Sequence, residues 1–299
     1  MKKLPLHLII LLILSAFTNV HSQNLMTDPG TAVFNVSVAG TTFNSVFDSD
    51  GEIKATSSAL HSILNAKVSV GISEHLSLLT NLPLGVYNHI EASSTDPGGL
   101  TNDKSVFHPG DLEAGIRLGI KPEDNFSAAF TYMQSFGTGK RDELYGLNTG
   151  YTDFNSQLRF HIRYSKNPRF IFQTYMGYVK RYKGFSDEFH AGITGWYIPS
   201  SQWKLEAAMA GIQPMKDPED NSNIYLHGLY HNYAGQLVGT GKLFFTPGEV
   251  QTYLGFTQLF RGQFIYASPI IEIGVIFKIG KTGHSSKTET PKDDAKLKD

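Results

Sequence analysis

The sequence predicts an all-β chain that folds into a transmembrane, antiparallel, up-and-down β-barrel of about twelve strands. Three observations support this prediction. Polar and apolar residues alternate along many segments, short and long connections follow each other between these segments, and an export signal precedes all of them.

Composition narrows the class of protein. The 299 residues are 40% hydrophobic and 18% charged, with 26 Lys and Arg against 27 Asp and Glu, and there is no cysteine. A charged fraction below the roughly 25% of soluble domains agrees with a membrane protein. The near-zero net charge argues against a nucleic-acid partner. The lack of cysteine excludes a disulfide scaffold, a thiolate metal site and a thiol nucleophile.

The first 22 residues have the pattern of a secretory signal peptide. Lys2 and Lys3 precede the apolar run 8–14, and small and polar residues follow as far as Ser22. An N-terminal membrane anchor is the alternative, but the run is short for a spanning helix of roughly 20 residues. We therefore expect residues 1–22 to be removed and residues 23–280 to form the barrel.

Period-two alternation predicts the strands one after another. In segment 111–120, Leu112, Ala114, Ile116, Leu118 and Ile120 share one face. Segments 64–72, 157–164, 203–211 and 271–279 repeat the pattern. Altogether, strands are expected near residues 38, 65, 81, 115, 131, 158, 175, 192, 207, 235, 255 and 273, although segment 223–245 could hold two.

Connection lengths favour a barrel over a soluble fold. Short, turn-forming connections are expected at 71–75, 121–125, 165–169, 199–202 and 246–249, and longer polar ones at 48–58, 91–109, 137–150, 183–188 and 213–223. Outer-membrane barrels alternate periplasmic turns with external loops in this way. A secreted β-sandwich or propeller would share the alternation within strands, but its strands are usually about five to six residues long. Aromatic residues near the strand ends, such as Tyr164, Trp196 and Trp203, predict interfacial girdles.

A family resemblance rests on two neighbouring stretches. Residues 70–84 contain an acidic turn residue and then Leu82-Pro83-Leu84, and residues 110–119 follow a Gly-Asp-Leu pattern. Together they resemble the bacterial outer-membrane barrels of the meta-pathway phenol-degradation group, which are similar to fatty-acid and aromatic-hydrocarbon channels. The resemblance covers residues 60–120 well and the rest by general pattern, and it implies transport of small hydrophobic compounds. Those hydrocarbon channels carry a substantial N-terminal plug, whereas only residues 23–30 precede the first strand here, so we expect no hatch-type gate.

None of the candidate catalytic and metal-binding patterns matches its motif fully. His75 and Ser77 have the spacing of outer-membrane phospholipases, but the Asn-Gly that follows the serine in that family is replaced by Leu78-Leu79. His227 and His231 have a helical zinc spacing, yet on a strand they would stand roughly 13 Å apart. The acidic stretches 48–52 and 217–220 are incomplete as calcium loops. We predict no catalytic residue, no metal and no cofactor.

The charged residues in the polar phase of the strands predict the lumen lining. They are Lys67, Glu113, Arg117, Arg159, His161, Arg163, Lys204, Glu206, Glu272 and Lys278. These charges either pair and fix the shape of the barrel or line a wet conduit, and both readings stay open. A partly desolvated guanidinium needs a carboxylate, so we expect the three arginines to pair with the three glutamates. About twelve strands leave a narrow lumen.

The predicted function is diffusion or facilitated uptake of a small solute, hydrophobic compounds included, across the outer membrane of a Gram-negative cell. A structural or surface-binding barrel with a closed lumen is the first alternative, and an outer-membrane lipid hydrolase is the second. The expected partners are outer-membrane lipid and a small-molecule solute. Residues 281–299 lack apolar periodicity, and we expect a disordered periplasmic tail that could contact a partner there.

Overall fold

The fold comes from a computed structural model that describes residues 25–48, 50–92, 102–123, 125–140, 147–150, 154–182, 186–216, 235–263 and 265–280. The predicted signal peptide and the predicted tail lie outside these residues. So do residues 217–220, His227 and His231. Within the described residues, no helix is long and apolar enough to cross a membrane.

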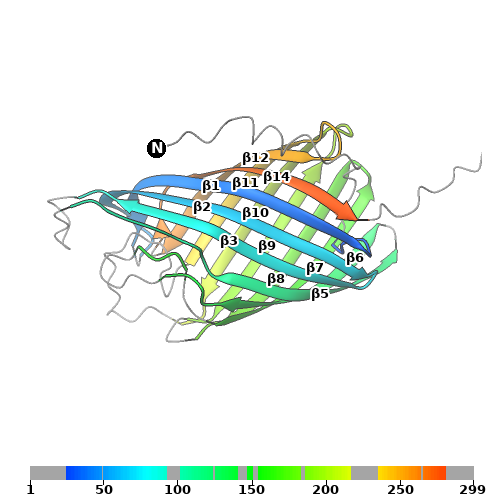
Figure 1. Cartoon of the computed structure of the whole chain (residues 1–299), viewed down its shortest axis with the longest axis horizontal. Coiled ribbons are helices and arrows are strands. Elements are labelled where there is room, and N and C mark those ends of the chain that lie inside the picture. The colour runs from blue at the N-terminus through cyan, green and yellow to red at the C-terminus, as the bar shows by residue number, and fades with distance from the viewer. Residues whose placement is uncertain are drawn as a thin grey trace, which may run out of the picture.

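Antiparallel strands make up the described chain (Figure 1). In chain order they are β1 (Thr31–Phe47), β2 (Ile53–Ser73), β3 (Leu76–Ile90), β4 (Lys104–His108), β5 (Leu112–Glu123), β6 (Phe126–Phe136), β7 (Asn155–Asn167), β8 (Phe170–Lys180), β9 (Glu188–Tyr197), β10 (Trp203–Pro214), β11 (Gly235–Phe245), β12 (Gln251–Gln263), β13 (Ile265–Tyr266) and β14 (Ile270–Gly280).

Twelve of these strands close into a barrel. Neighbours in sequence pair in order from β1 to β3 and from β5 to β12, β3 pairs with β5, and β12 pairs with β14. The first and last strands then join, from Thr31 opposite Gly280 to Gly40 opposite Ile271, which leaves no open edge. The short strands β4 and β13 pair with β3 and β1 outside this ring. The predicted all-β barrel of about twelve strands is confirmed.

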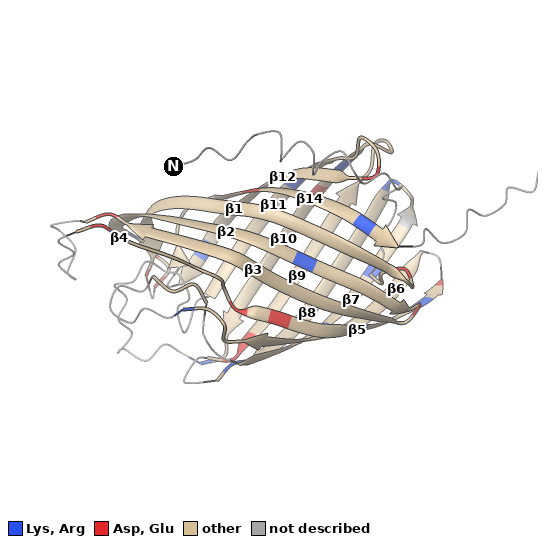
Figure 2. Ribbon diagram, in the orientation of Figure 1, with Lys and Arg blue, Asp and Glu red and all other residues tan. Residues whose placement is uncertain are grey.

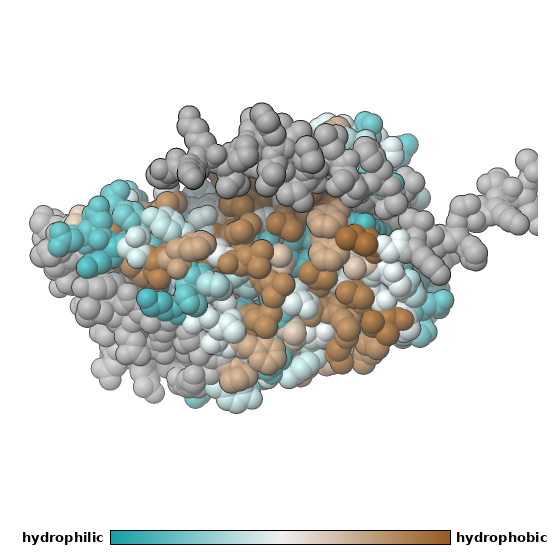
Figure 3. All heavy atoms as spheres, viewed as in Figure 1, coloured by the Kyte–Doolittle hydropathy of each residue, from teal (hydrophilic) through white to brown (hydrophobic). Residues whose placement is uncertain are grey.

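The two faces of the wall have opposite chemistry. Along β5, Ile116, Leu118 and Ile120 are exposed on the outside, whereas Arg117 lines an internal cavity. Phe160 and Ile193 are exposed on the outer wall in the same way. Figure 3 shows an apolar band over the middle of the visible face, with hydrophilic residues toward both ends. Figure 2 shows few charged residues along the middle of the strands and more near their ends. Such a continuous apolar exterior suits lipid rather than water.

Connection length distinguishes the two ends of the barrel. At one end, here called the short-turn end, brief turns join β2 to β3, β5 to β6, β7 to β8, β9 to β10 and β11 to β12. Residue 31, which begins β1, and Gly280, which ends β14, lie at the same end. The longer connections between β3 and β5, β6 and β7, and β10 and β11 lie at the opposite end, the loop end.

The predicted long loop at 48–58 is wrong. Strand β1 continues to Phe47, which is directly opposite Ile53 at the start of β2. The connection is a tight turn in which Asp48 Oδ1 accepts hydrogen bonds from the Asp50 and Glu52 N–H groups, both at 2.9 Å. At this end Val46 and Phe47 of β1 are buried against β13 and its neighbours, whereas small and polar residues fill 54–58 of β2. The sequence therefore lacks apolar alternation here although the backbone pairing persists. The predicted strand near 235 is the start of a single strand, β11.

Candidate functional site in the barrel lumen

An internal cavity of 680 Å³ is the candidate functional site. Lys67 on β2, Asn81 on β3, Glu113 and Arg117 on β5, and Arg159 on β7 line it. All of them occupy the polar phase of their strands, so the alternation that puts isoleucine and phenylalanine on the outside puts these side chains inside. The cavity therefore brings together charged residues that are far apart in sequence.

The two central arginines are held by neutral groups. Arg117 donates from Nε to Thr131 Oγ1 at 3.0 Å and from Nη1 to the Leu25 carbonyl at 2.8 Å. The Arg159 guanidinium lies 5.2 Å from the centroid of the Tyr175 ring. With its amide oriented so that the oxygen faces this guanidinium, Gln157 accepts from Arg159 Nη2 at 2.8 Å. Among the described residues, neither arginine pairs with a carboxylate.

The lumenal carboxylates have other partners. Glu113 Oε2 accepts from Asn81 Nδ2 at 2.7 Å, and Glu206 Oε2 accepts from Trp196 Nε1 at 2.7 Å. Glu272 Oε2 forms an ion pair with Lys242 Nζ at 2.6 Å. The expected pairing of these glutamates with arginines is therefore wrong, because strand register brings other side chains closer. Trp196 also leaves the predicted outer girdle, since its indole N–H points to a lumenal carboxylate.

The remaining predicted lumen residues lie apart from the central cavity, with one exception. Lys204 is buried, with its Nζ 3.5 Å from the Phe244 ring centroid and 3.2 Å from Gln251 Oε1. Arg163 lines a smaller cavity of 360 Å³ at the short-turn end. Lys278 Nζ lies 3.8 Å from Asp28 Oδ2. His161 is the exception, since it lines the central cavity together with Arg117 and Arg159.

His161 carries an unused hydrogen-bonding atom. The residue is only 6% exposed, and its Nδ1 lies 3.4 Å from the Gln173 amide nitrogen, which can only donate. This contact makes Nδ1 an acceptor and leaves the proton of the neutral ring on Nε2. Within the described residues, Nε2 has no hydrogen-bond partner. His161 therefore adds a donor to the wall beside the two arginines.

Residues 25–30 lie against the lumen wall at the short-turn end. Leu25 is buried and its carbonyl accepts from Arg117, while the Thr27 N–H donates to Ser77 Oγ at 3.2 Å. The Gly30 N–H donates to the Gly71 carbonyl at 2.9 Å. A Cβ on Gly71 would overlap the Asp28 carbonyl, so the segment can approach β2 closely only because this residue is glycine. We expected these residues to be too few for a hatch-type gate and did not predict that they lie inside the barrel.

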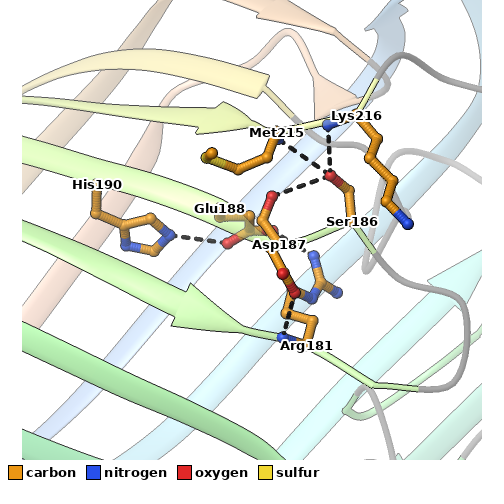
Figure 4. Close-up of polar contacts among 7 residues, drawn as sticks. All are labelled: Arg181, Ser186, Asp187, Glu188, His190, Met215 and Lys216. Atoms are coloured by element: carbon orange, nitrogen blue, oxygen red, sulfur yellow. Dashed lines mark hydrogen bonds and ion pairs between the residues drawn. The ribbon is translucent and has the colours of Figure 1, made fainter.

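A second polar cluster, at the loop end, was also missed (Figure 4). Glu188 at the start of β9 forms an ion pair with Arg181, and its Oε2 is hydrogen-bonded to His190 Nε2 at 2.8 Å. All three residues are buried and line the central cavity. Glu188 and His190 occupy the polar phase of β9, and this alternation could have identified them, but we expected Glu188 to lie in the loop 183–188.

The same cluster fastens the β8–β9 connection to the end of β10. Ser186 Oγ accepts from the Met215 and Lys216 N–H groups at 3.1 and 3.0 Å. Asp187 accepts from Lys180 Nζ at 2.8 Å and from the Tyr178 hydroxyl at 2.6 Å. Partial burial acts to raise the pKa of the Asp187 carboxyl, but these hydrogen bonds and one from the Arg181 N–H outweigh it and lower the pKa to about 2.

The patterns considered for catalysis have structural partners. His75 Nδ1 lies 3.1 Å from the Gly119 carbonyl, whereas Ser77 Oγ accepts from Thr27, so the two side chains serve different contacts. Asp48 holds its own turn and lies 3.5 Å from Lys54 Nζ. In the part of the chain that the structure describes, no group of three or more His, Asp or Glu side chains could hold a metal ion.

Comparison with solved structures gives the same fold. An outer-membrane channel from Pseudomonas putida F1 superposes with a TM-score of 0.66 at 13% identity, over 87% of this chain and all of that chain. The NanC porin superposes with a TM-score of 0.53 at 11% identity, over 82% of this chain and all of that chain. The CymD monoaromatic hydrocarbon channel reaches only 0.44 at 8% identity, over 89% of this chain and 95% of that chain, too low to carry an argument. No protein-family model and no curated protein matches the sequence. The chain has the barrel fold of outer-membrane channels.

Proposed function

We propose that this protein is an outer-membrane channel through which small polar solutes diffuse. The main observation behind the proposal is a cavity of 680 Å³, with several charged side chains in its lining, inside a closed barrel whose outer wall is apolar. A solute entering this cavity meets charged and amide side chains such as Lys67, Asn81 and Arg159. Apolar side chains such as Ile63, Leu79 and Val179 also line the cavity, where the family resemblance would place a hydrophobic solute. The charged and amide groups of the same lining would lose hydrogen-bonding water to such a solute, which favours polar solutes.

The proposed location follows from the outer wall and the export signal. Aromatic pairs such as Phe170–Tyr197 and Trp203–Phe245, with ring centroids 4.9 and 4.7 Å apart, lie at the short-turn end and suit a membrane interface. This end would face the periplasm, and the loop end the outside. A cysteine placed at Asp96 should then react with an impermeant maleimide on intact cells, and one placed at Asn167 should not. Equal labelling of both would contradict this orientation.

Conductance of the refolded protein in planar bilayers tests the channel directly. The wild type should give stepwise currents. Trp in place of the cavity-lining Gln157 should lower the unit conductance, because the indole fills part of the lumen. Trp in place of its neighbour Leu158, which is exposed on the outer wall, should leave conductance unchanged and is the matched control.

A closed structural barrel is the alternative function. Two observations favour it: residues 25–30 lie inside the short-turn end, and Thr149 and Gly150, from the connection between β6 and β7, line the cavity at the loop end. If the folded protein gives no current in bilayers, the closed structural barrel is the correct function. Lipid hydrolysis has less support, because His75 and Ser77 do not contact each other.

A further inference from the structure

The central cavity holds basic side chains whose charge the protein does not neutralise by pairing. Lys67 is solvent-exposed toward the lumen and, among the described residues, has neither a hydrogen bond nor an ion pair. Arg117 and Arg159 bind a hydroxyl, a carbonyl, an amide and an aromatic face, all of which are neutral. All three basic side chains line the same cavity.

The acidic groups that line this cavity are already engaged. Glu188 is shared between Arg181 and His190, and Glu113 binds Asn81. Asp111 Oδ1 accepts from the Gly139 N–H at 2.8 Å. Glu272 and Glu113 both lie within electrostatic range of Lys67, and Glu113 also lies within range of Arg159. Among the described residues, however, Glu272 pairs with Lys242, and Glu113 forms no ion pair. The positive charges in this part of the wall therefore outweigh the negative ones that remain.

The geometry of the donors suits a carboxylate. Arg117 and Arg159 lie within electrostatic range of each other, and Arg159 also lies within range of Lys67. His161, whose Nε2–H has no partner among the described residues, lies beside both arginines. A planar guanidinium offers a fork of N–H groups that matches the two oxygens of a carboxylate, whereas an ammonium acts as a mobile point charge.

We propose that Lys67, Arg117 and Arg159 form an anion-binding constriction, and that the channel favours small organic carboxylates over cations and neutral solutes. This inference rests on the proposed channel function and names its class of solute. A positive wall in a narrow, low-dielectric passage raises the local concentration of anions and repels cations. Because the arginines are held by neutral groups, a carboxylate does not have to displace a competing glutamate.

The test is ion selectivity of the reconstituted full-length mature protein, measured as the reversal potential under a KCl gradient. Wild type should be more permeable to chloride than to potassium. Lys67→Gln and Arg159→Gln should each lower the chloride-to-potassium permeability ratio by about twofold, since one charge is removed from the passage. Glu113→Gln should raise the ratio. Arg169→Gln, at an exposed position in the β7–β8 turn, is the control and should leave the ratio unchanged.

Succinate provides a second readout that uses a carboxylate itself. Added succinate should reduce the chloride current of the wild type, and Arg159→Gln should weaken this block. Lys67→Gln keeps the test valid if the arginine variants fail to fold, because among the described residues Lys67 forms no hydrogen bond or ion pair that the substitution would break. Currents with cation preference, or a ratio insensitive to both substitutions, would overturn the anion constriction while leaving the channel intact. Absence of current in folded wild type would overturn both.

Discussion

The ion pair between Lys242 and Glu272 allows a quantitative prediction about the stability of the barrel. The two residues lie two strands apart in one row, with Gly255 of β12 opposite both. Because this glycine has no side chain, Lys242 and Glu272 meet above it at 2.6 Å. The Tyr253 hydroxyl donates to the other carboxylate oxygen at 2.8 Å. Glu272→Gln removes the charge and keeps the shape.

The expected loss of stability in Glu272→Gln depends on the contacts that the variant can still form. The side chains are 20% and 22% exposed, so the pair is mostly removed from water. A hydrogen bond to a charged group contributes roughly 1.5–3 kcal/mol. Gln can still accept from Tyr253, and Lys242 can turn toward Glu206, which is opposite it in register. These compensations place the expected loss at about 1–2 kcal/mol.

Glu113→Gln is the matched control. Its partner, Asn81, is neutral, so a glutamine oxygen can accept the same hydrogen bond and the loss should stay below about 1 kcal/mol. Urea unfolding in lipid vesicles, followed by the fluorescence of Trp196 and Trp203, measures both variants. If Glu113→Gln lowered the free energy of unfolding as much as Glu272→Gln, the ion pair with Lys242 would not explain the larger contribution expected of Glu272. That result would refute the prediction.

Three further predictions concern the outer wall, the loop end and the N-terminal segment. Phe160→Arg should destabilise the barrel in vesicles by about 2–4 kcal/mol, and Gln157→Arg should destabilise it clearly less. A larger loss of stability for Gln157→Arg would mean that Phe160 does not face the lipid. Asp187 has its pKa lowered to about 2, from roughly 3.9 when unfolded, so its stabilising contribution is complete above about pH 4 and disappears as the pH falls through 2. Asp187→Asn should therefore lower the midpoint of urea unfolding near neutral pH, and a difference undiminished at pH 2 would contradict the assigned hydrogen bonds. Deleting residues 25–29 should raise the unit conductance in bilayers, and an unchanged value would show that this segment does not narrow the pathway.

The sequence was sufficient for the wall of this barrel. In β5 and β7, strict alternation separates Ile116 and Phe160 outside from Arg117 and Arg159 inside, and backbone geometry alone converts that pattern into two faces. Turn-forming residues also marked the strand ends correctly between β2 and β3, β5 and β6, and β7 and β8. Prediction failed at 48–58, where the small and polar residues 54–58 of β2 show no alternation although they pair with β1.

The contents of the lumen were harder to predict for a physical reason. Alternation tells which side chains face inward, but not which of them lie in the same row, because that depends on strand register and on bulges. Glu206 meets Trp196, and Glu113 meets Asn81, since each pair is directly opposite in the observed register. Residues 25–30 were missed because six residues without periodicity carry no signal of where they dock.

Register also divides the lumen wall into two electrostatically different parts. From β9 to β14 the row through Glu206, Lys242 and Glu272 alternates negative and positive charges, so neighbouring strands neutralise one another. From β2 to β7 the corresponding partners of Arg117 are Ser77 and Thr131, which satisfy hydrogen bonds without supplying charge. The first part can stabilise the closed barrel by pairing, and in the second part Arg117 has neutral hydrogen-bond partners, as the proposed anion site requires. The structural and the conductive readings of the lumenal charges, which the sequence left as alternatives, can therefore hold on different strands of the same wall.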